Sequence, residues 1–129
     1  MANIEFKPGP IIRSLPLVSG QTIANWNTAE STILTIGESG VTYWATLCVV
    51  NIGSLTVGAD ITTRGYMIVN GTEEFLGSDI STVGTDPNVF WPGGLWFFAI
   101  HEAIRLTAQS DTPADNGLAI KYEYILERH

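Results

Sequence analysis

Apolar and polar residues alternate with a period of two along much of this chain, and helical periodicity is nearly absent. In residues 118–127 every even position is apolar: Leu118, Ile120, Tyr122, Tyr124 and Leu126. Successive side chains of a β-strand point to opposite faces, so this alternation predicts a half-buried strand. FAIHEAIRL (residues 98–106) is the one plausible helical turn, but Ile104, Leu106 and Ala108 alternate with Arg105 and Thr107 equally well, as in a strand. The chain is therefore limited to an all-β fold.

Turn signals divide the remaining sequence into short segments. Asn70-Gly71 lies between YMIV and TEEFL, and this pair is preferred in two-residue type I′ turns, so a β-hairpin is predicted there. Glycine, proline and aspartate recur at 37–40, 53–54, 58–60, 84–87, 92–94 and 111–117. Such spacing predicts an antiparallel β-sandwich, jelly-roll-like with about eight strands. An immunoglobulin domain is disfavoured because one cysteine cannot supply its Cys–Trp–Cys framework.

The first 26 residues differ from the rest. Prolines at positions 8, 10 and 16 lack a backbone donor and favour an extended path, while the apolar residues around them follow no clean period. The sequence thus predicts an extended N-terminal arm over residues 1–26 and a β-sandwich domain over residues 27–129. The arm could lie on the surface of its own domain or on that of a neighbouring molecule, and the sequence is compatible with both.

Charge limits the partners. The net charge is -7, and the six lysines and arginines are scattered along the sequence, which argues against binding to nucleic acid or to an anionic membrane. No apolar stretch reaches the roughly 20 residues of a membrane-spanning helix, and no signal-peptide pattern is present. We expect synthesis in a host cytoplasm without ordinary export.

Self-association is expected from the distribution of apolar residues. Charged residues make up 15% of the chain, against about 25% in typical domains. In segments 41–52 and 95–100 neither the odd-numbered nor the even-numbered positions form a polar set. In a strand of a sheet with one face in solvent, one of these two alternating sets is polar. An arm, a loop or another subunit therefore has to cover part of the outer surface.

Residues able to carry catalysis or bind metal are few. Cys48 lies in an apolar run without a basic neighbour and is interpreted as an inert buried thiol. His101 and His129 lack the nucleophile and orienting group of a catalytic triad. SDTPADNG (residues 110–117) has the oxygen density of a calcium loop but lacks its residue order, so a solvated turn is preferred. We expect no enzymatic activity, no catalytic residue, no cofactor and no metal, although carboxylates paired across a sheet are invisible in sequence.

The stretch FWPGGLWFF (residues 90–98) packs five of the thirteen aromatic residues around a Pro-Gly-Gly turn. A sugar-binding platform normally has polar donors beside its rings, and here Asn88 and Asp86 are the nearest. A place in the core or in an interface is therefore favoured.

These features together resemble the small β-sandwich decoration (cement) proteins of tailed-bacteriophage capsids. The resemblance rests on the MANIEFKPGP arm, the threonine- and glycine-rich strands, the scarcity of lysine, the acidic charge and the closing strand GLAIKYEYILE. The resemblance is one of overall composition and strand pattern over the whole chain. It includes no diagnostic motif, so it assigns no functional role to any residue of this chain. The closing strand, with Ile104-Arg105-Leu106 ahead of it, is also similar to the last strands of trimeric jelly rolls in phage fibres.

The resemblance implies a structural virion protein on the capsid exterior, bound to the major capsid protein as a homotrimer. The residues expected in the oligomer or capsid interface are Ile4, Phe6, Ile11, Ile12, Trp44, Trp91, Trp96 and Phe97. The alternative is a carbohydrate- or receptor-binding head of a phage tail or fibre. Its expected stacking residues are Trp26, Trp44, Trp91 and Trp96.

Overall fold

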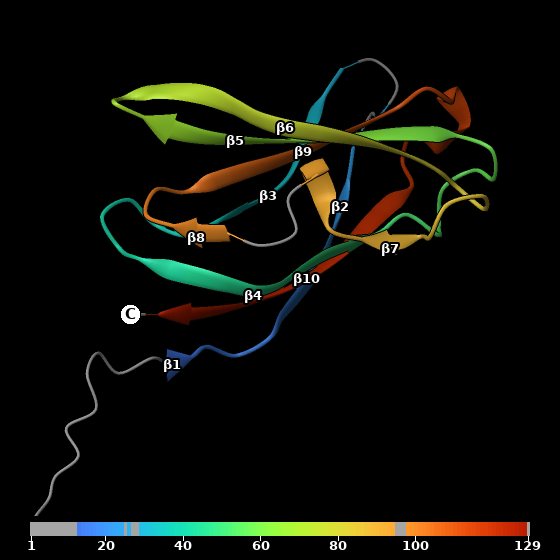
Figure 1. Ribbon diagram of the computed structural model, residues 1–129. Helices are drawn as coiled ribbons and strands as arrows, with labels where there is room; N and C mark the ends of the chain where they lie inside the picture. Colours follow the sequence, from blue (N-terminus) through green and yellow to red (C-terminus); the bar gives the residue numbers. More distant parts are fainter. Residues whose placement is uncertain (1–12, 25, 27–28, 95–97, 129) are drawn as a thin grey trace, which may run out of the picture.

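Ten strands build the protein in the computed structural model, which describes residues 13–24, 26, 29–94 and 98–128 (Figure 1). They are β1 (Arg13–Ser14), β2 (Val18–Ile23), β3 (Ser31–Ile36), β4 (Tyr43–Asn51), β5 (Asp60–Val69), β6 (Thr72–Thr82), β7 (Val89–Phe90), β8 (Phe98–Ile100), β9 (Ile104–Ser110) and β10 (Ala119–Arg128). Two short 3-10 turns, η1 (Pro92–Gly94) and η2 (Pro113–Asp115), lie in the connections.

The strands form two antiparallel sheets that pack face to face. In the first sheet β10 and β4 are central, β1 and β2 both pair with β10, and β7 and β8 both pair with β4. The second sheet has the order β3-β9-β5-β6. When β1 with β2 and β7 with β8 are taken as interrupted strands, each sheet has four strands, and the chain crosses between sheets in jelly-roll order. The predicted all-β, jelly-roll-like sandwich is therefore confirmed.

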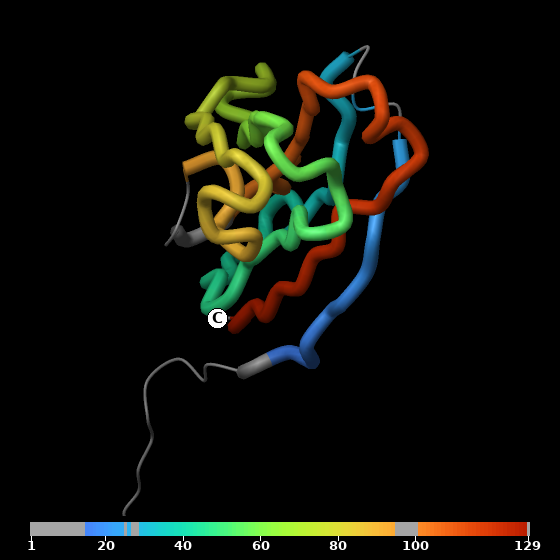
Figure 2. The backbone as a smooth tube through the Cα atoms, turned by 90° about the vertical axis from the view of Figure 1, so that its right-hand side faces the viewer, coloured from blue at the N-terminus to red at the C-terminus, as the bar shows by residue number. Residues whose placement is uncertain are grey.

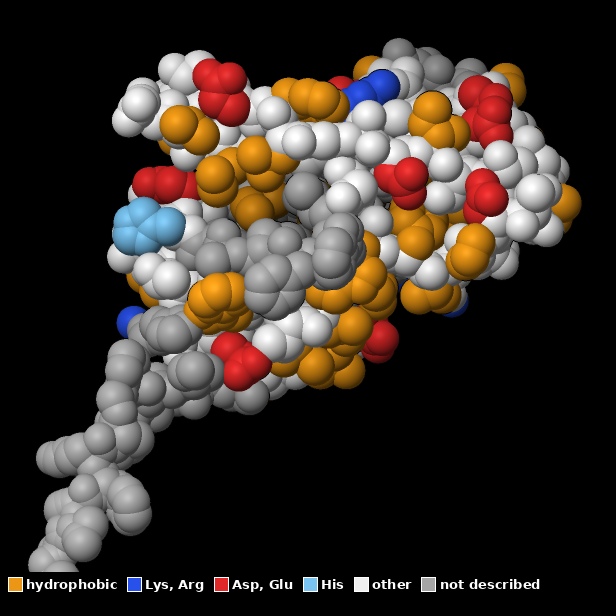
Figure 3. All heavy atoms as spheres, in the orientation of Figure 1, with side chains coloured by type: hydrophobic (Ala, Val, Ile, Leu, Met, Phe, Trp, Pro, Cys, Tyr) orange, Lys and Arg blue, Asp and Glu red, His pale blue; other side chains and the backbone are white. Residues whose placement is uncertain are grey.

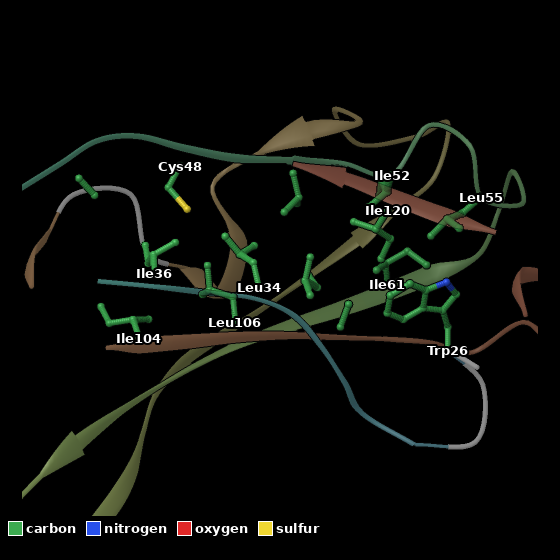
Figure 4. Close-up of a cluster of buried hydrophobic side chains, with 14 of the residues drawn as sticks. Trp26, Leu34, Ile36, Cys48, Ile52, Leu55, Ile61, Ile104, Leu106 and Ile120 are labelled. Atoms are coloured by element: carbon green, nitrogen blue, oxygen red, sulfur yellow. The ribbon is translucent and has the colours of Figure 1, made fainter. Parts of the chain in front are cut away.

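The core lies between the sheets and is closed at one end by Trp26. The Trp26 side chain is 0% exposed, and its indole Nε1 donates a hydrogen bond to the carbonyl of Leu118 at 2.7 Å. Buried tryptophan is stable in this position because its N–H has an acceptor. Ile61 of β5 and Ile120 of β10 lie beside the indole (Figure 4).

The predicted hairpin is present and it projects from the sandwich. Asn70 (φ 51°) and Gly71 (φ 80°) both have positive φ, as a type I′ turn requires, and Val69 pairs with Thr72 across the turn. Pairing of β5 with β9 ends at Met67 opposite Ile104. The end of the hairpin therefore extends beyond β9 (Figure 1).

The prediction that residues 1–26 form an arm outside the sheets is wrong for residues 13–23. β1 and β2 pair with β10 along its length, from Arg13 opposite Arg128 to Ile23 opposite Ala119 (Figure 2). Pro16 falls in the gap between β1 and β2, so its missing donor interrupts the strand without excluding it from the sheet edge. Trp26 also belongs to the core. Residues 1–12 lie outside the described residues.

A register shift explains most of the two-sided apolar pattern of β4. Ile125 pairs with Leu47 and Leu126 with Ala45, so Thr46 is an extra residue on β4. Such a bulge reverses the parity of the residues that follow it. Tyr43 and Ala45 are accordingly buried before the bulge, and Cys48 and Val50 after it: all four point inward. In the other predicted segment, residues 95–97 lie outside the described residues.

Candidate interaction surfaces

The outer face of the β10–β4 sheet retains apolar side chains. On β4 the residues between the buried ones are Trp44, Leu47 and Val49, each partly exposed, and the register places Leu47 beside Ile125 of β10. Trp44, predicted in an interface, therefore belongs to this outward-facing row. Leu47, Val49 and Ile125 make this row mainly apolar, although Glu127 lies opposite Trp44, so the row is a surface that association would bury.

A shallow groove of about 310 Å³ continues this face toward β2 and β7. Its lining includes Ser19, Val49, Asn51, Val89, Lys121 and Glu123. Glu123 accepts a hydrogen bond from Ser19 Oγ at 3.1 Å, and Val89 is 52% exposed. The groove thus has charged side chains on β10 and, on β4 and β7, the apolar Val49 and Val89 beside the polar Asn51.

The second surface is the β5–β6 hairpin. Among the described residues, eleven large hydrophobic side chains are exposed, and five of these lie on this hairpin: Ile68, Val69, Phe75, Leu76 and Ile80. Single exposed apolar residues are common in proteins, but a concentration on one projecting element is typical of a contact surface. Hydrophobic side chains are visible among few basic ones on the face shown in Figure 3. This surface was not predicted from the sequence, although the apolar residues of FLGSDI in β6 carry the signal.

An aromatic and charged network rigidifies the outer face of the hairpin. Arg105 Nε and Nη2 donate to the two carboxylate oxygens of Glu73 at 2.9 and 2.7 Å, and Arg105 Nη1 donates to Thr32 Oγ1 at 3.1 Å. The guanidinium carbon lies 4.6 Å from the centroid of the Tyr66 ring, which meets Phe75 edge to face at 5.8 Å. Bidentate pairing and cation–π stacking together fix this row across β6, β5 and β9.

Glu30 offsets the positive charge of Arg64 on the neighbouring part of the same face. It accepts hydrogen bonds from Tyr66 Oη at 2.5 Å and from Thr107 Oγ1, and lies 3.5 Å from Arg64 Nη1. Burial by itself raises the pKa of Glu30, but the two hydroxyl donors and the arginine cations outweigh it and lower this pKa. Hydrogen bonds from Arg105 likewise lower the pKa of Glu73. Arg64 and Arg105 are thus paired with carboxylates, which disfavours binding to phosphate groups.

Cys48 and His101, the two residues considered for catalysis, lack the surroundings that would activate them. Cys48 is 1% exposed, and burial raises its pKa to about 12, so the thiolate nucleophile is absent at neutral pH. His101 is exposed, with Nδ1 3.2 Å from Thr42 Oγ1. Neither residue is arranged for nucleophilic catalysis.

Asp115 corrects the expectation of a solvated turn at residues 110–117. Its carboxylate is 0% exposed and accepts hydrogen bonds from Ser110 Oγ at 2.5 Å and from the backbone N and Oγ1 of Thr56, both at 2.7 Å. These bonds attach the β9–β10 connection to the β4–β5 connection. Within the described ranges no group of three or more histidine, cysteine or acidic residues is arranged to hold a metal, and no helix there is long and apolar enough to cross a membrane.

The Pro-Gly-Gly turn of the aromatic stretch packs between the sheets. Gly93 N donates to Thr63 Oγ1 at 2.7 Å in a buried contact, and a Cβ added to Gly93 would lie 3.0 Å from the backbone of Gly65. Glycine is required there because the backbones approach too closely for a side chain. Phe90 and Trp91 pack, partly buried, against the core. The turn is therefore structural.

The predicted interface residues fall into three groups. Trp44 lies on the outer face, and Trp91 lies at the margin of the core. Ile4, Phe6, Ile11, Ile12, Trp96 and Phe97 lie outside the described residues. For the alternative head function, the expectation that Trp26 stacks on a ligand is wrong because this side chain is fully buried.

Comparison of the chain with models of known protein families, with curated proteins and with solved structures finds no significant match. Its function is therefore inferred from the surfaces described above.

Proposed function

We propose that this chain is a structural virion protein, made in the host cytoplasm, that decorates the outside of an assembled phage capsid as a homotrimer. The observation that carries this proposal is the presence of two separate surfaces with exposed apolar side chains. One is the outer face of the β10–β4 sheet, and the other is the β5–β6 hairpin, on which Ile68, Phe75 and Ile80 share the outer side. A clamp on a lattice needs one surface for its own copies and one for the shell. The β4 row with its groove serves the first purpose and the projecting hairpin the second.

The hairpin suits contact with the major capsid protein because it is both rigid and apolar. Its register is fixed by the Asn70-Gly71 turn, and its outer side is fixed by the Arg105–Glu73 pair. Phe75 (58% exposed) and Ile80 (62% exposed) gain about 1–2 kcal/mol each when a partner buries them fully, since part of each side chain is already buried. Little conformational entropy is lost on binding, since the strands are already ordered.

The proposal assigns the chain no catalytic role, no cofactor and no nucleic-acid or membrane partner. Its charge supports this assignment, since the chain carries -7 overall and the two arginines of the β3-β9-β5-β6 sheet, Arg64 and Arg105, are paired with glutamates.

Co-sedimentation with capsids assembled without accessory proteins tests the proposal. We expect saturable binding of the parent, and binding at least tenfold weaker for Phe75→Ser with Ile80→Ser, as expected when more than about 1.4 kcal/mol of contact energy is lost. Val57→Ser is the matched control, because Val57 is 79% exposed and lies away from the hairpin. Absence of parent binding, or equal binding by the hairpin variant, contradicts the proposal.

A carbohydrate- or receptor-binding head is the second candidate, and one observation favours it. Phe75, Tyr66 and Arg105 form a row in which an exposed ring adjoins hydrogen-bonding groups, an arrangement that suits stacking on a sugar. Titration of host surface polysaccharide, followed by NMR shifts of Tyr66 and Phe75, distinguishes the two functions. Saturable shifts that Phe75→Ala abolishes, without capsid binding, favour the head.

A further inference from the structure

The groove on the β10–β4 sheet has two unlike walls, and this asymmetry indicates what binds there. Lys121 and Glu123 lie on the outward face of β10, two residues apart and so separated by about 7 Å. Across the sheet, Glu123 is opposite Val49, and Lys121 is opposite Asn51, which in turn is opposite Val89. The β10 side of the groove therefore presents a cation and an anion in sequence, while the β4 and β7 side presents the apolar Val49 and Val89 together with the polar Asn51.

The charges of this wall are available for a partner. Within the described part of the chain Lys121 forms no ion pair, and Ser19 engages one of the two carboxylate oxygens of Glu123. A segment that fits the groove has a negative and a positive residue two positions apart on one side, and apolar residues on the other.

The N-terminal sequence of this chain has that pattern. In Ile4-Glu5-Phe6-Lys7 the charged residues alternate with the apolar ones, so an extended segment of this sequence presents Glu5 and Lys7 on one side and Ile4 and Phe6 on the other. The spacing of Glu5 and Lys7 equals that of Lys121 and Glu123, with opposite signs.

The direction of β1 favours the groove of a second copy over that of the same copy. Arg13 pairs with Arg128, the last residue of β10, and β1 runs antiparallel to β10. At Arg13 the chain, followed toward its first residue, therefore points past the end of β10 and away from Lys121. Lys7 and Gly9 each precede a proline, which disfavours helical backbone at both residues. Twelve extended residues reach about 40 Å, enough to arrive at a neighbouring domain.

We propose that residues 4–7 of one copy bind in the β10–β4 groove of a second copy. Glu5 then lies beside Lys121 and Lys7 beside Glu123, with Ile4 and Phe6 against Val49 and Val89. This inference rests on the self-association in the proposed function and names the contact that produces it. Each copy both donates a segment and accepts one, so the contact can be heterologous, and it gives a trimer where the rotation between copies closes after three.

Reversal of the charges on each side, separately and together, tests the inference. The variants are Lys121→Glu with Glu123→Lys, Glu5→Lys with Lys7→Glu, and the combination of all four changes. The net charge is the same in all of them. We expect each double variant to associate about tenfold more weakly by light scattering across a concentration series, and the fourfold variant to recover to within about threefold of the parent. Glu74→Lys, an exposed charge change on the other sheet, is expected to change nothing.

Three outcomes overturn the inference. The first is that both double variants associate as strongly as the parent, and the second is that the fourfold variant associates as weakly as the double variants. The third is that the charge reversals lower the melting temperature of a single copy without altering its association. The last outcome places the segment in its own groove. A parent that sediments with capsids while every swap leaves association unchanged overturns this inference and leaves the proposed function standing.

Discussion

Replacement of Asp115 by alanine tests the most specific structural contact of the protein. The carboxylate is fully buried and accepts three hydrogen bonds of 2.5–2.7 Å, one from Ser110 and two from Thr56. A hydrogen bond to a charged group contributes about 1.5–3 kcal/mol, but a donor left behind regains part of this by binding water or rotating. With one backbone N–H and two hydroxyls losing their acceptor, we expect Asp115→Ala to lower the free energy of unfolding by about 3–5 kcal/mol.

Urea unfolding followed by tryptophan fluorescence measures this loss, because Trp26 is buried beside the same connection and its backbone carbonyl accepts a hydrogen bond from Ser110 N. Thr56→Ala and the double variant complete a mutant cycle, because Thr56 Oγ1 donates to Asp115 across the two connections, and we expect a coupling of about 1–3 kcal/mol. Glu74→Ala, exposed on β6, should stay within about 0.5 kcal/mol of the parent. A loss below about 1 kcal/mol for Asp115→Ala, or additivity with Thr56→Ala, would refute the view that this carboxylate joins the two connections.

Gly71→Val should lower stability by at least about 1 kcal/mol, since a β-branched residue is strained at positive φ; a melting curve equal to that of the parent contradicts this. Because the pKa of Glu30 is lowered in the folded state, its contribution is present above the unfolded pKa and lost as pH falls through the folded pKa. Melting temperature should therefore fall less steeply below about pH 4.5 in Glu30→Gln than in the parent. Cys48 should react with a thiol reagent at the rate of unfolding, because burial raises its pKa to about 12; rapid labelling of folded protein contradicts its burial. Deletion of residues 2–12, which precede β1, should leave the melting temperature within a few degrees of the parent but remove self-association, and capsid binding should then weaken by orders of magnitude because single copies lose avidity; a large loss of stability with binding retained assigns the segment to the fold.

Local chemistry made several strands predictable. β9 and β10 follow from alternation, since one side of each faces the core, and the β5–β6 hairpin follows from the backbone preference of Asn70-Gly71. Fold class could be derived in the same way, because short alternating segments between turns have few other ways to bury their apolar sides.

Pairing between strands that are distant in the sequence was harder to predict. β2 joins the sheet by pairing with β10, about a hundred residues later, for example Gly20 opposite Tyr122; the ring of Tyr122 occupies the space that a side chain at residue 20 would need. Nothing local in the proline-rich start indicates this. Asp115 is similar: its partner Thr56 is distant in sequence, so an oxygen-rich turn could not be recognised as a buried one. At β4 the bulge at Thr46 concealed which side was inward.

Stability and association depend on different residues in this fold, and this separation makes the association experiments interpretable. The core and the Asp115 contacts lie between the sheets or in their connections, while Phe75, Ile80, Lys121 and Glu123 lie on outer faces. Exposed substitutions away from buried networks usually change stability by about 0.5 kcal/mol or less. Loss of capsid binding in the hairpin variant, or of self-association in the groove variants, therefore reports on the surface itself. Variants of the two outer faces should also act independently, because the core separates them and residues without shared partners contribute additively. If the two surfaces are separate, the hairpin variant should still form trimers. Single copies of the groove variant should still bind capsids, although weakly.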